Sequence, residues 1–189
     1  FLAALVLGLV LLTLSCGRGC VPPGDVWAAL TGAPGANAAF VVTELRLPRA
    51  VMGLFAGASF GLGGVAFQIM LRNPLASPDI IGISASAGAA AVFAIVILAL
   101  DGWLVSLVAV AAGLGVAALI WALSSRRGAA GARLILIGIG VSAMLDSVTA
   151  YVLLEAPAWD RAEAMRWLTG SLNGMQLVQA LPVAGALLV

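Results

Sequence analysis

The fold is decided by the stretch from Glu44 to Asp79, which reads "ELRLPRAVMGLFAGASFGLGGVAFQIMLRNPLASPD". Its central run, Ala50 to Leu71, contains no charged side chain. A bilayer core about 30 Å thick needs about 20 apolar residues of α-helix, so this run is long enough to cross it. Arg46 and Arg49 precede the run on either side of Pro48, and a segment with two prolines follows it. The stretch therefore predicts a membrane-spanning helix with a basic boundary before it and a turn after it.

The rest of the chain has the same character. Of its 189 residues, 63% are hydrophobic and only 9% are charged, whereas soluble domains carry about 25% charged residues. Only helices and closed barrels satisfy the backbone in lipid, and these apolar runs are continuous rather than alternating, which favours helices. We therefore expect an all-α, polytopic transmembrane helix bundle, with about five complete spans and the start of a sixth. The predicted spans are approximately residues 2–16, 50–71, 80–100, 103–123, 134–154 and 175–189.

The connectors and the two ends of the chain add to this expectation. Turn residues fill the segment from Arg18 to Pro48, with short helical pieces expected around Pro23–Leu30 and Ala38–Leu45. A further short helix is expected over Asp160–Leu168. Because the sequence begins and stops inside apolar runs, we expect residues 1–189 to form one transmembrane domain that continues at both ends in a longer protein.

Several classes of function are excluded by what the sequence lacks. It has no histidine, which removes a zinc site, a Ser-His-Asp triad and a haem-ligating histidine from this segment. It also has no Walker motif, no nucleophile elbow and no metal-ligand cluster, so we expect neither an enzyme nor a chain that binds its own cofactor. A net charge of +1 gives no reason to expect nucleic acid as a partner.

The cysteine pair Cys16 and Cys20 lies where the first apolar run stops. A local disulfide would form there if this end faced an oxidising compartment. The interpretation favoured here is two small hydrophobic residues at a helix end.

The arginines give an orientation. Short loops between spans carry the topological signal, and basic residues concentrate in the cytoplasmic ones. Two short loops hold one group of arginines, whereas the arginines of the other side are dispersed among acids in long connectors. The first group comprises Arg72, Arg126, Arg127 and Arg133, and we place it in the cytoplasm. The Arg46–Arg49 boundary then lies outside.

Inside the predicted spans, small and polar residues recur on single helical faces. Gly53, Gly57 and Gly61 are four residues apart, a spacing that lets another helix approach closely, and Gly138 with Ser142 repeats it. These glycines predict helix packing and say nothing about cargo.

Asp146 is the sharpest single residue, because it lies near the middle of a predicted span, where an ionisable group costs a few kcal/mol. Ser142, Asp146 and Thr149 share one helical face. Such a stripe either lines a pathway or hydrogen-bonds a neighbouring helix through a protonated Asp146, and both interpretations stay open. An ion-coupled secondary transporter would also use such a carboxylate.

The loop with Arg72, Asn73 and Pro74 has a similar ambiguity. Its two X-Pro pairs force an extended or turned backbone between spans. A well-made turn and a contact with a cytoplasmic partner are both consistent with it.

Three ordered blocks resemble the FecCD-type permease subunits of ABC importers for iron–siderophore complexes, haem and cobalamin. The first is "RLPR" followed by a glycine-rich helix, Gln68 and "RNPLASP" with "GISASAGA" behind it. The second is "LILIGIGVSAML" at the start of the fifth predicted span, and the third is "RWLTGSL", Arg166 to Leu172. At Asp146 the family more often carries a small or neutral polar residue, so this position departs from the pattern.

The resemblance implies a fold and a set of partners. The whole subunit would have about ten spans, would pair with a second permease subunit, and would sit among lipids of the bacterial plasma membrane. Cytoplasmic ATPase subunits would consume the ATP, and an extracytoplasmic solute-binding protein would deliver the cargo, with iron–siderophore as the default. The contacts with the ATPases would follow the sixth span, beyond this chain. The alternative is the ion-coupled secondary transporter that uses Asp146.

The resemblance also implies residue roles. Arg46 and Arg49 would pair with acidic side chains of the binding protein, and the fifth predicted span would line the translocation pathway. Gly131 and Ala132 would lie near the cytoplasmic gate, in the loop ahead of that span.

Overall fold

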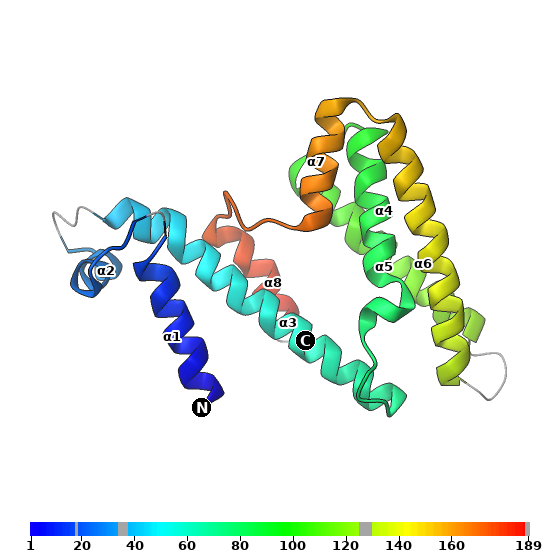
Figure 1. The fold of residues 1–189 in the computed structure, drawn as a ribbon, viewed down its shortest axis with the longest axis horizontal. Coiled ribbons are helices and arrows are strands. Elements are labelled where there is room, and N and C mark those ends of the chain that lie inside the picture. Colours follow the sequence, from blue (N-terminus) through cyan, green and yellow to red (C-terminus); the bar gives the residue numbers. More distant parts are fainter. Residues whose placement is uncertain (18, 34–37, 125–129, 188–189) are drawn as a thin grey trace. The chain divides into compact units, whose positions relative to one another are not determined.

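The computed structural model describes residues 1–17, 19–33, 38–124 and 130–187, with side chains of the last range described from Arg133 onward. Within these ranges the chain is helical and has no β-strand, which confirms the predicted all-α class (Figure 1). The elements are α1 (Leu2–Ser15), α2 (Pro23–Leu30), η1 (Val41–Arg46), α3 (Leu47–Leu71), η2 (Pro78–Ile81), α4 (Ile83–Val96), α5 (Gly102–Ser124), α6 (Ala130–Glu155), α7 (Ala158–Thr169), η3 (Leu177–Gln179) and α8 (Ala180–Leu187).

Three helices of the described chain are long and apolar enough to cross a membrane: Val41–Leu71, Gly102–Ser124 and Arg133–Glu155. Shorter apolar helices cover Leu2–Ser15, Ile83–Val96 and Leu177–Leu187. One predicted span was therefore too long. The span predicted over 80–100 is α4, because Pro78–Ile81 forms a 3-10 turn and Gly82 reverses the chain at a φ of 79° before the helix begins. The span predicted from residue 175 is η3 followed by the short α8.

The start of the second span also differs from the prediction. The helix does not begin at Ala50 but runs without a break from Val41, first as a π-helical segment and then as α3. Proline inside an α-helix lacks one hydrogen bond and collides with the carbonyl four residues earlier. The wider π-helical turns directly before Pro48 accommodate it. Arg49 consequently lies within a helix and not at a helix N-terminus.

The chain divides into two compact units. The first comprises Phe1–Gly61 and Leu172–Val189. Its core forms where α1, α2 and the π-helical segment meet: Leu14, Val26, Ala29, Val42 and Ala50.

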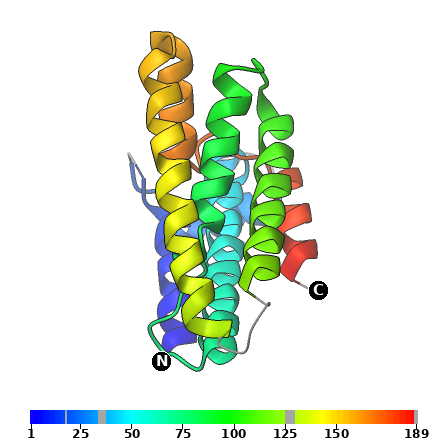
Figure 2. The ribbon, with the colours of Figure 1, turned by 90° about the vertical axis from the view of Figure 1, so that its right-hand side faces the viewer.

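The second unit, Leu62–Ser171, packs α4 beside α5, α6 and α7 (Figures 1 and 2). It has two hydrophobic clusters. One joins Ile81, Ile120 and Leu134, so η2, the last turns of α5 and the start of α6 lie at one end of this unit. The other joins the end of α4, the start of α5 and α7 through Ile95, Val105 and Ala164. The turn before α4 and the turn between α4 and α5 therefore lie at opposite ends of the unit, as the predicted spans require.

Candidate functional site

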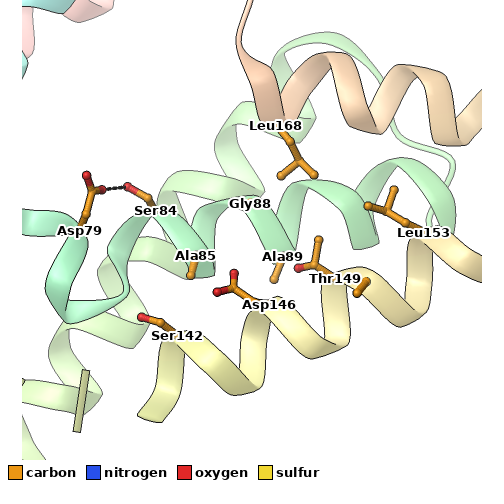
Figure 3. Close-up of a pocket in the computed structure, with 11 residues that line it drawn as sticks. Asp79, Ser84, Ala85, Gly88, Ala89, Ser142, Asp146, Thr149, Leu153 and Leu168 are labelled. Carbon is orange, nitrogen blue, oxygen red and sulfur yellow. Dashed lines mark hydrogen bonds between the residues drawn. The ribbon is translucent and has the colours of Figure 1, made fainter. Parts of the chain in front are cut away.

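An open pocket of ≈ 500 Å³ lies in the second unit between η2, α4, α6 and α7 (Figure 3). The predicted polar stripe of α6, Ser142, Asp146 and Thr149, lines one wall. Asp79 and Ser84 line the wall that η2 and α4 provide. The remaining lining residues are small or apolar: Ala85, Gly88, Ala89, Ala150, Leu153 and Leu168.

The three hydroxyl groups that line this pocket already donate their protons in hydrogen bonds within the protein. Ser142 Oγ donates to the carbonyl of Gly138 at 2.8 Å, and Thr149 Oγ1 donates to the carbonyl of Leu145 at 2.8 Å. Ser84 Oγ donates to Asp79 Oδ1 (Figure 3). A hydroxyl oxygen that has donated its proton still has lone pairs, and an ionised carboxylate only accepts.

The lining therefore presents acceptors. No lysine or arginine is among the described residues that line the pocket. Two carboxylates, Asp79 and Asp146, and three hydroxyl oxygens can accept hydrogen bonds from a donor-bearing or positively charged group. Asp146 is exposed and makes no hydrogen bond with another described residue, so the neighbouring-helix partner considered for a protonated Asp146 is not found in the described part of the chain.

Close backbone contact holds η2 against α6 at this pocket. A Cβ at Gly138 would lie 2.6 Å from Ile81 Cα and 2.8 Å from the Ile80 carbonyl oxygen. A Cβ at Gly82 would lie 2.7 Å from Ser142 Oγ, and its φ of +79° disfavours any side chain. Glycine at these two positions thus sets the distance between the wall that carries Asp79 and the wall that carries Asp146.

The glycines of α3 have a different environment. A Cβ at Gly53 would lie 3.9 Å from Leu172 Cδ1, and no atom of the described chain comes within 4 Å of a Cβ at Gly57 or Gly61. The described part of the chain therefore supplies no helix against the Gly57–Gly61 face, and the packing role of these two residues stays a prediction.

The loop after α3 is an ordered turn. Arg72 has a φ of 49°, and Asn73 Oδ1 accepts a hydrogen bond from the Leu75 amide at 3.0 Å. Pro74 follows within this turn, so the segment has the geometry of a structural connector. Arg126 and Arg127 lie outside the described residues, and for the predicted gate residues Gly131 and Ala132 only the helical backbone is described.

The predicted basic boundary forms a second site, in the first unit. Cys16 and Cys20 are joined by a disulfide, so the interpretation as two small hydrophobic residues was wrong. Arg46 donates from Nη1 to the carbonyls of Leu14 and Ser15 and from Nη2 to that of Gly19. Sequence reasoning missed this role, because the partners lie 27 to 32 residues earlier in the chain.

Arg49 differs from Arg46. It is exposed, and it makes no hydrogen bond with another described residue. Both arginines line a pocket of ≈ 710 Å³ whose wall includes the disulfide-bonded loop, with Cys16, Gly17, Gly19 and Cys20. The structure thus brings the two predicted docking residues to one pocket, and three of the donors of Arg46 bind the backbone there.

Long apolar helices, a polar stripe along one of them and a basic site near the start of another define a multi-pass helical membrane protein. The chain belongs to the FecCD transport family, whose model matches residues 5–189.

Relatives agree with this assignment. The chain is 39% identical over 171 residues to the ferric enterobactin transport system permease protein FepG of Escherichia coli, covering 90% of this chain and 52% of that protein. It is 37% identical to the achromobactin transport system permease protein CbrC of Dickeya dadantii, covering 98% and 54%. In fold, it matches a metal-chelate type ABC transporter solved in an inward-facing conformation, with a TM-score of 0.79 at 23% identity, covering 99% of this chain and 56% of that one. The chain spans about half the length of the relatives it matches.

Proposed function

We propose that this chain forms part of the membrane-spanning permease subunit of an ATP-driven importer that moves an iron–siderophore complex, with haem or cobalamin as further cargo classes. The observation that carries the proposal is the family match over nearly the whole chain, together with similarity to permeases named for ferric enterobactin and achromobactin. The acceptor-lined pocket of the second unit supports it, because a transport pathway through lipid needs a polar wall.

The partners follow from this proposal. A second permease subunit would complete the pathway, separate cytoplasmic ATPase subunits would hydrolyse ATP, and a solute-binding protein would deliver the cargo outside. The sequence contains no Walker motif, which is consistent with a separate source of energy. The membrane would be the bacterial plasma membrane, with lipid around the long apolar helices.

Two independent features support one orientation. Arginines concentrate in the short loops at Arg72 and around Arg133, which favours the cytoplasm for that end of the second unit. Disulfides persist in oxidising compartments, which favours the outer side for Cys16 and Cys20. We therefore propose that Arg49, beside the disulfide, faces the binding protein and that Gly131 and Ala132 lie near the cytoplasmic exit. On the same grounds, the turn at Arg72, Asn73 and Pro74 would face the cytoplasm.

The test is transport by the complete complex. The full-length permease with its ATPase and binding protein is reconstituted in proteoliposomes, with radiolabelled ferric enterobactin and radiolabelled cyanocobalamin as probes. We expect uptake of one probe that needs both ATP on the ATPase side and the binding protein on the other, and that continues when ion gradients are collapsed.

The second candidate function is the ion-coupled secondary transporter. It is favoured by one observation: Asp146 lies in the middle of a predicted span, is exposed and lines an open pocket. Uptake that follows a proton or sodium gradient, proceeds without ATP and is abolished by Asp146→Asn would establish this candidate and refute the importer.

A further inference from the structure

Asp146 is a carboxylate without a partner near the middle of the apolar helix Arg133–Glu155. Its side chain is exposed, and it makes no hydrogen bond or ion pair with another described residue. Figure 3 shows the carboxylate pointing from α6 toward the part of α4 that carries Ala85 and Ala89. An ionisable side chain at this depth of a membrane is costly to place, which points to a functional use.

The surroundings of Asp146 supply no positive charge. The pocket of ≈ 500 Å³ is lined by a second carboxylate, Asp79, and by apolar or hydroxyl-bearing side chains, and no arginine or lysine is among its described lining residues. Arg166 is close in sequence to the lining residue Leu168, but residues two apart on a helix do not share a face. The walls that the described chain gives this pocket are therefore acidic.

A carboxylate in this position acts on the charge of any solute that enters the pocket. At about 6 Å, two unit charges interact strongly enough to change an equilibrium about threefold even at the dielectric constant of bulk water, and a lower dielectric constant increases the effect. A cation gains this factor and an anion loses it. Two solutes that differ only in the sign of their charge are therefore separated about tenfold by one ionised Asp146.

We propose that Asp146 is a specificity-determining residue that selects the charge of the solute in this pocket. It favours a cationic or neutral cargo that presents an ammonium group or other hydrogen-bond donors, and it slows an anionic chelate such as an iron tris-catecholate. Iron trishydroxamates fit this class, because three hydroxamates balance the charge of Fe³⁺. That a cargo crosses this pocket rests on the proposed function, whereas the selection by charge rests on the lining described above.

The selection is tested first without cargo, in the complete transporter in lipid nanodiscs. Ala150 also lines the pocket, is exposed, and lies one turn after Asp146 on α6, so their Cβ atoms are about 5–6 Å apart. Ala150→Cys is labelled at low ionic strength by two methanethiosulfonates of similar size, one with a trimethylammonium group and one with a sulfonate group. The measured quantity is the ratio of the two labelling rates, cationic over anionic.

We expect Asp146→Asn to lower this ratio about tenfold, because it removes the charge and keeps the size of the side chain. Added salt should lower the ratio in the protein that retains Asp146, since mobile ions screen the carboxylate. An unchanged ratio in Asp146→Asn would overturn the inference. So would the absence of labelling by either reagent, because the pocket would then be closed to charged solutes.

Two controls isolate the carboxylate of Asp146. Glu155 is an exposed carboxylate at the end of the same helix and is not among the described lining residues, so Glu155→Gln should leave the ratio unchanged. The uncharged hydroxyethyl methanethiosulfonate reports the access and reactivity of the thiol, and its rate should be similar with and without Asp146→Asn. Because Cys16 and Cys20 are joined in a disulfide, the transporter without Ala150→Cys supplies the background rate.

The second measurement separates this inference from the proposed function. In the proteoliposome assay, Asp146→Asn should raise the uptake of ferric enterobactin, an anionic tris-catecholate, about threefold, whereas the uptake of cyanocobalamin, which has no net charge, should not change. A fall in ferric enterobactin uptake would overturn the selection by charge. If neither probe is taken up under any condition, the proposed function fails, while the labelling ratio still decides whether Asp146 selects the charge of a solute.

Discussion

Gly138→Ala is the substitution for which the structure gives the sharpest expectation. A Cβ at this position would lie 2.6 Å from Ile81 Cα and 2.8 Å from the Ile80 carbonyl oxygen, whereas ordinary contact begins at 3.4 Å. The shortfall at Ile81 Cα is 3.4 − 2.6 = 0.8 Å. Both opposing atoms belong to the backbone of η2, so neither can rotate away as the end of a side chain would. The turn and α6 must therefore separate.

The magnitude follows from two opposing effects. Overpacking a close contact costs about 1–3 kcal/mol, and rigid backbone on both sides favours the upper half of that range. Replacing a helical glycine by alanine stabilises the helix by roughly 0.5–1 kcal/mol. We expect a net loss of about 1–2.5 kcal/mol in the free energy of unfolding for Gly138→Ala.

Gly140 provides the matched control, because it lies in the same helix and no described atom comes within 4 Å of its Cβ position. Gly140→Ala should stabilise the protein by roughly 0.5–1 kcal/mol, the effect of helix propensity alone. Both variants of the full-length permease are unfolded reversibly by titrating SDS into mixed micelles and followed by tryptophan fluorescence. Equal midpoints for Gly138→Ala and Gly140→Ala would refute the close approach of η2 and α6.

Three further substitutions test the pocket and the helix ends. Gly82→Ala should cost about 1–2 kcal/mol from the φ of +79° alone, and more from the 2.7 Å approach to Ser142 Oγ. Ser142→Ala removes the Oγ atom, so in that background Gly82→Ala should keep the cost of the positive φ and lose the cost of the collision, as measured by the same SDS titration. An identical loss of stability in both backgrounds would contradict the contact between residue 82 and Ser142 Oγ. Asp146→Asn should change ATP-driven uptake by less than about tenfold, or about 1.4 kcal/mol, in the proteoliposome assay, because the proposed importer does not couple to an ion; complete loss would contradict it. Arg161→Gln should cost about 1 kcal/mol through the loss of its hydrogen bonds to the Leu154 and Ala156 carbonyls, and unchanged hydrogen exchange at the end of α6 would argue against them.

The long helices could be predicted because the bilayer fixes their length and composition. The spans predicted over 103–123 and 134–154 correspond to α5, Gly102–Ser124, and α6, Ala130–Glu155. Hydropathy failed where the backbone changes direction inside an apolar run. Ile80 and Ile81 are as apolar as the helix that follows, yet they belong to a 3-10 turn that ends at Gly82 in the left-handed region.

The candidate pathway was predictable in part for the same reason. Ser142, Asp146 and Thr149 share a face because helical periodicity alone places them there. Asp79 and Ser84 reach the opposite wall through a turn that has no periodicity, so no spacing in the sequence aligns them with the stripe. The available signal was the order of residues, with Pro78 and Asp79 followed closely by Gly82 and Ser84, which is typical of a turn leading into a helix.

The basic boundary illustrates what no local pattern contains. An arginine at the end of an apolar run can bind a partner, reach the lipid interface or hold backbone carbonyls, and its neighbours in sequence are the same in each case. Which use it serves depends on carbonyls that the fold brings to it, here from Leu14, Ser15 and Gly19. Two arginines only three residues apart therefore acquire different environments on one helix. Arg46 turns toward the end of α1 and is half-buried, while Arg49 stays exposed at the edge of the pocket, where a carboxylate can reach it.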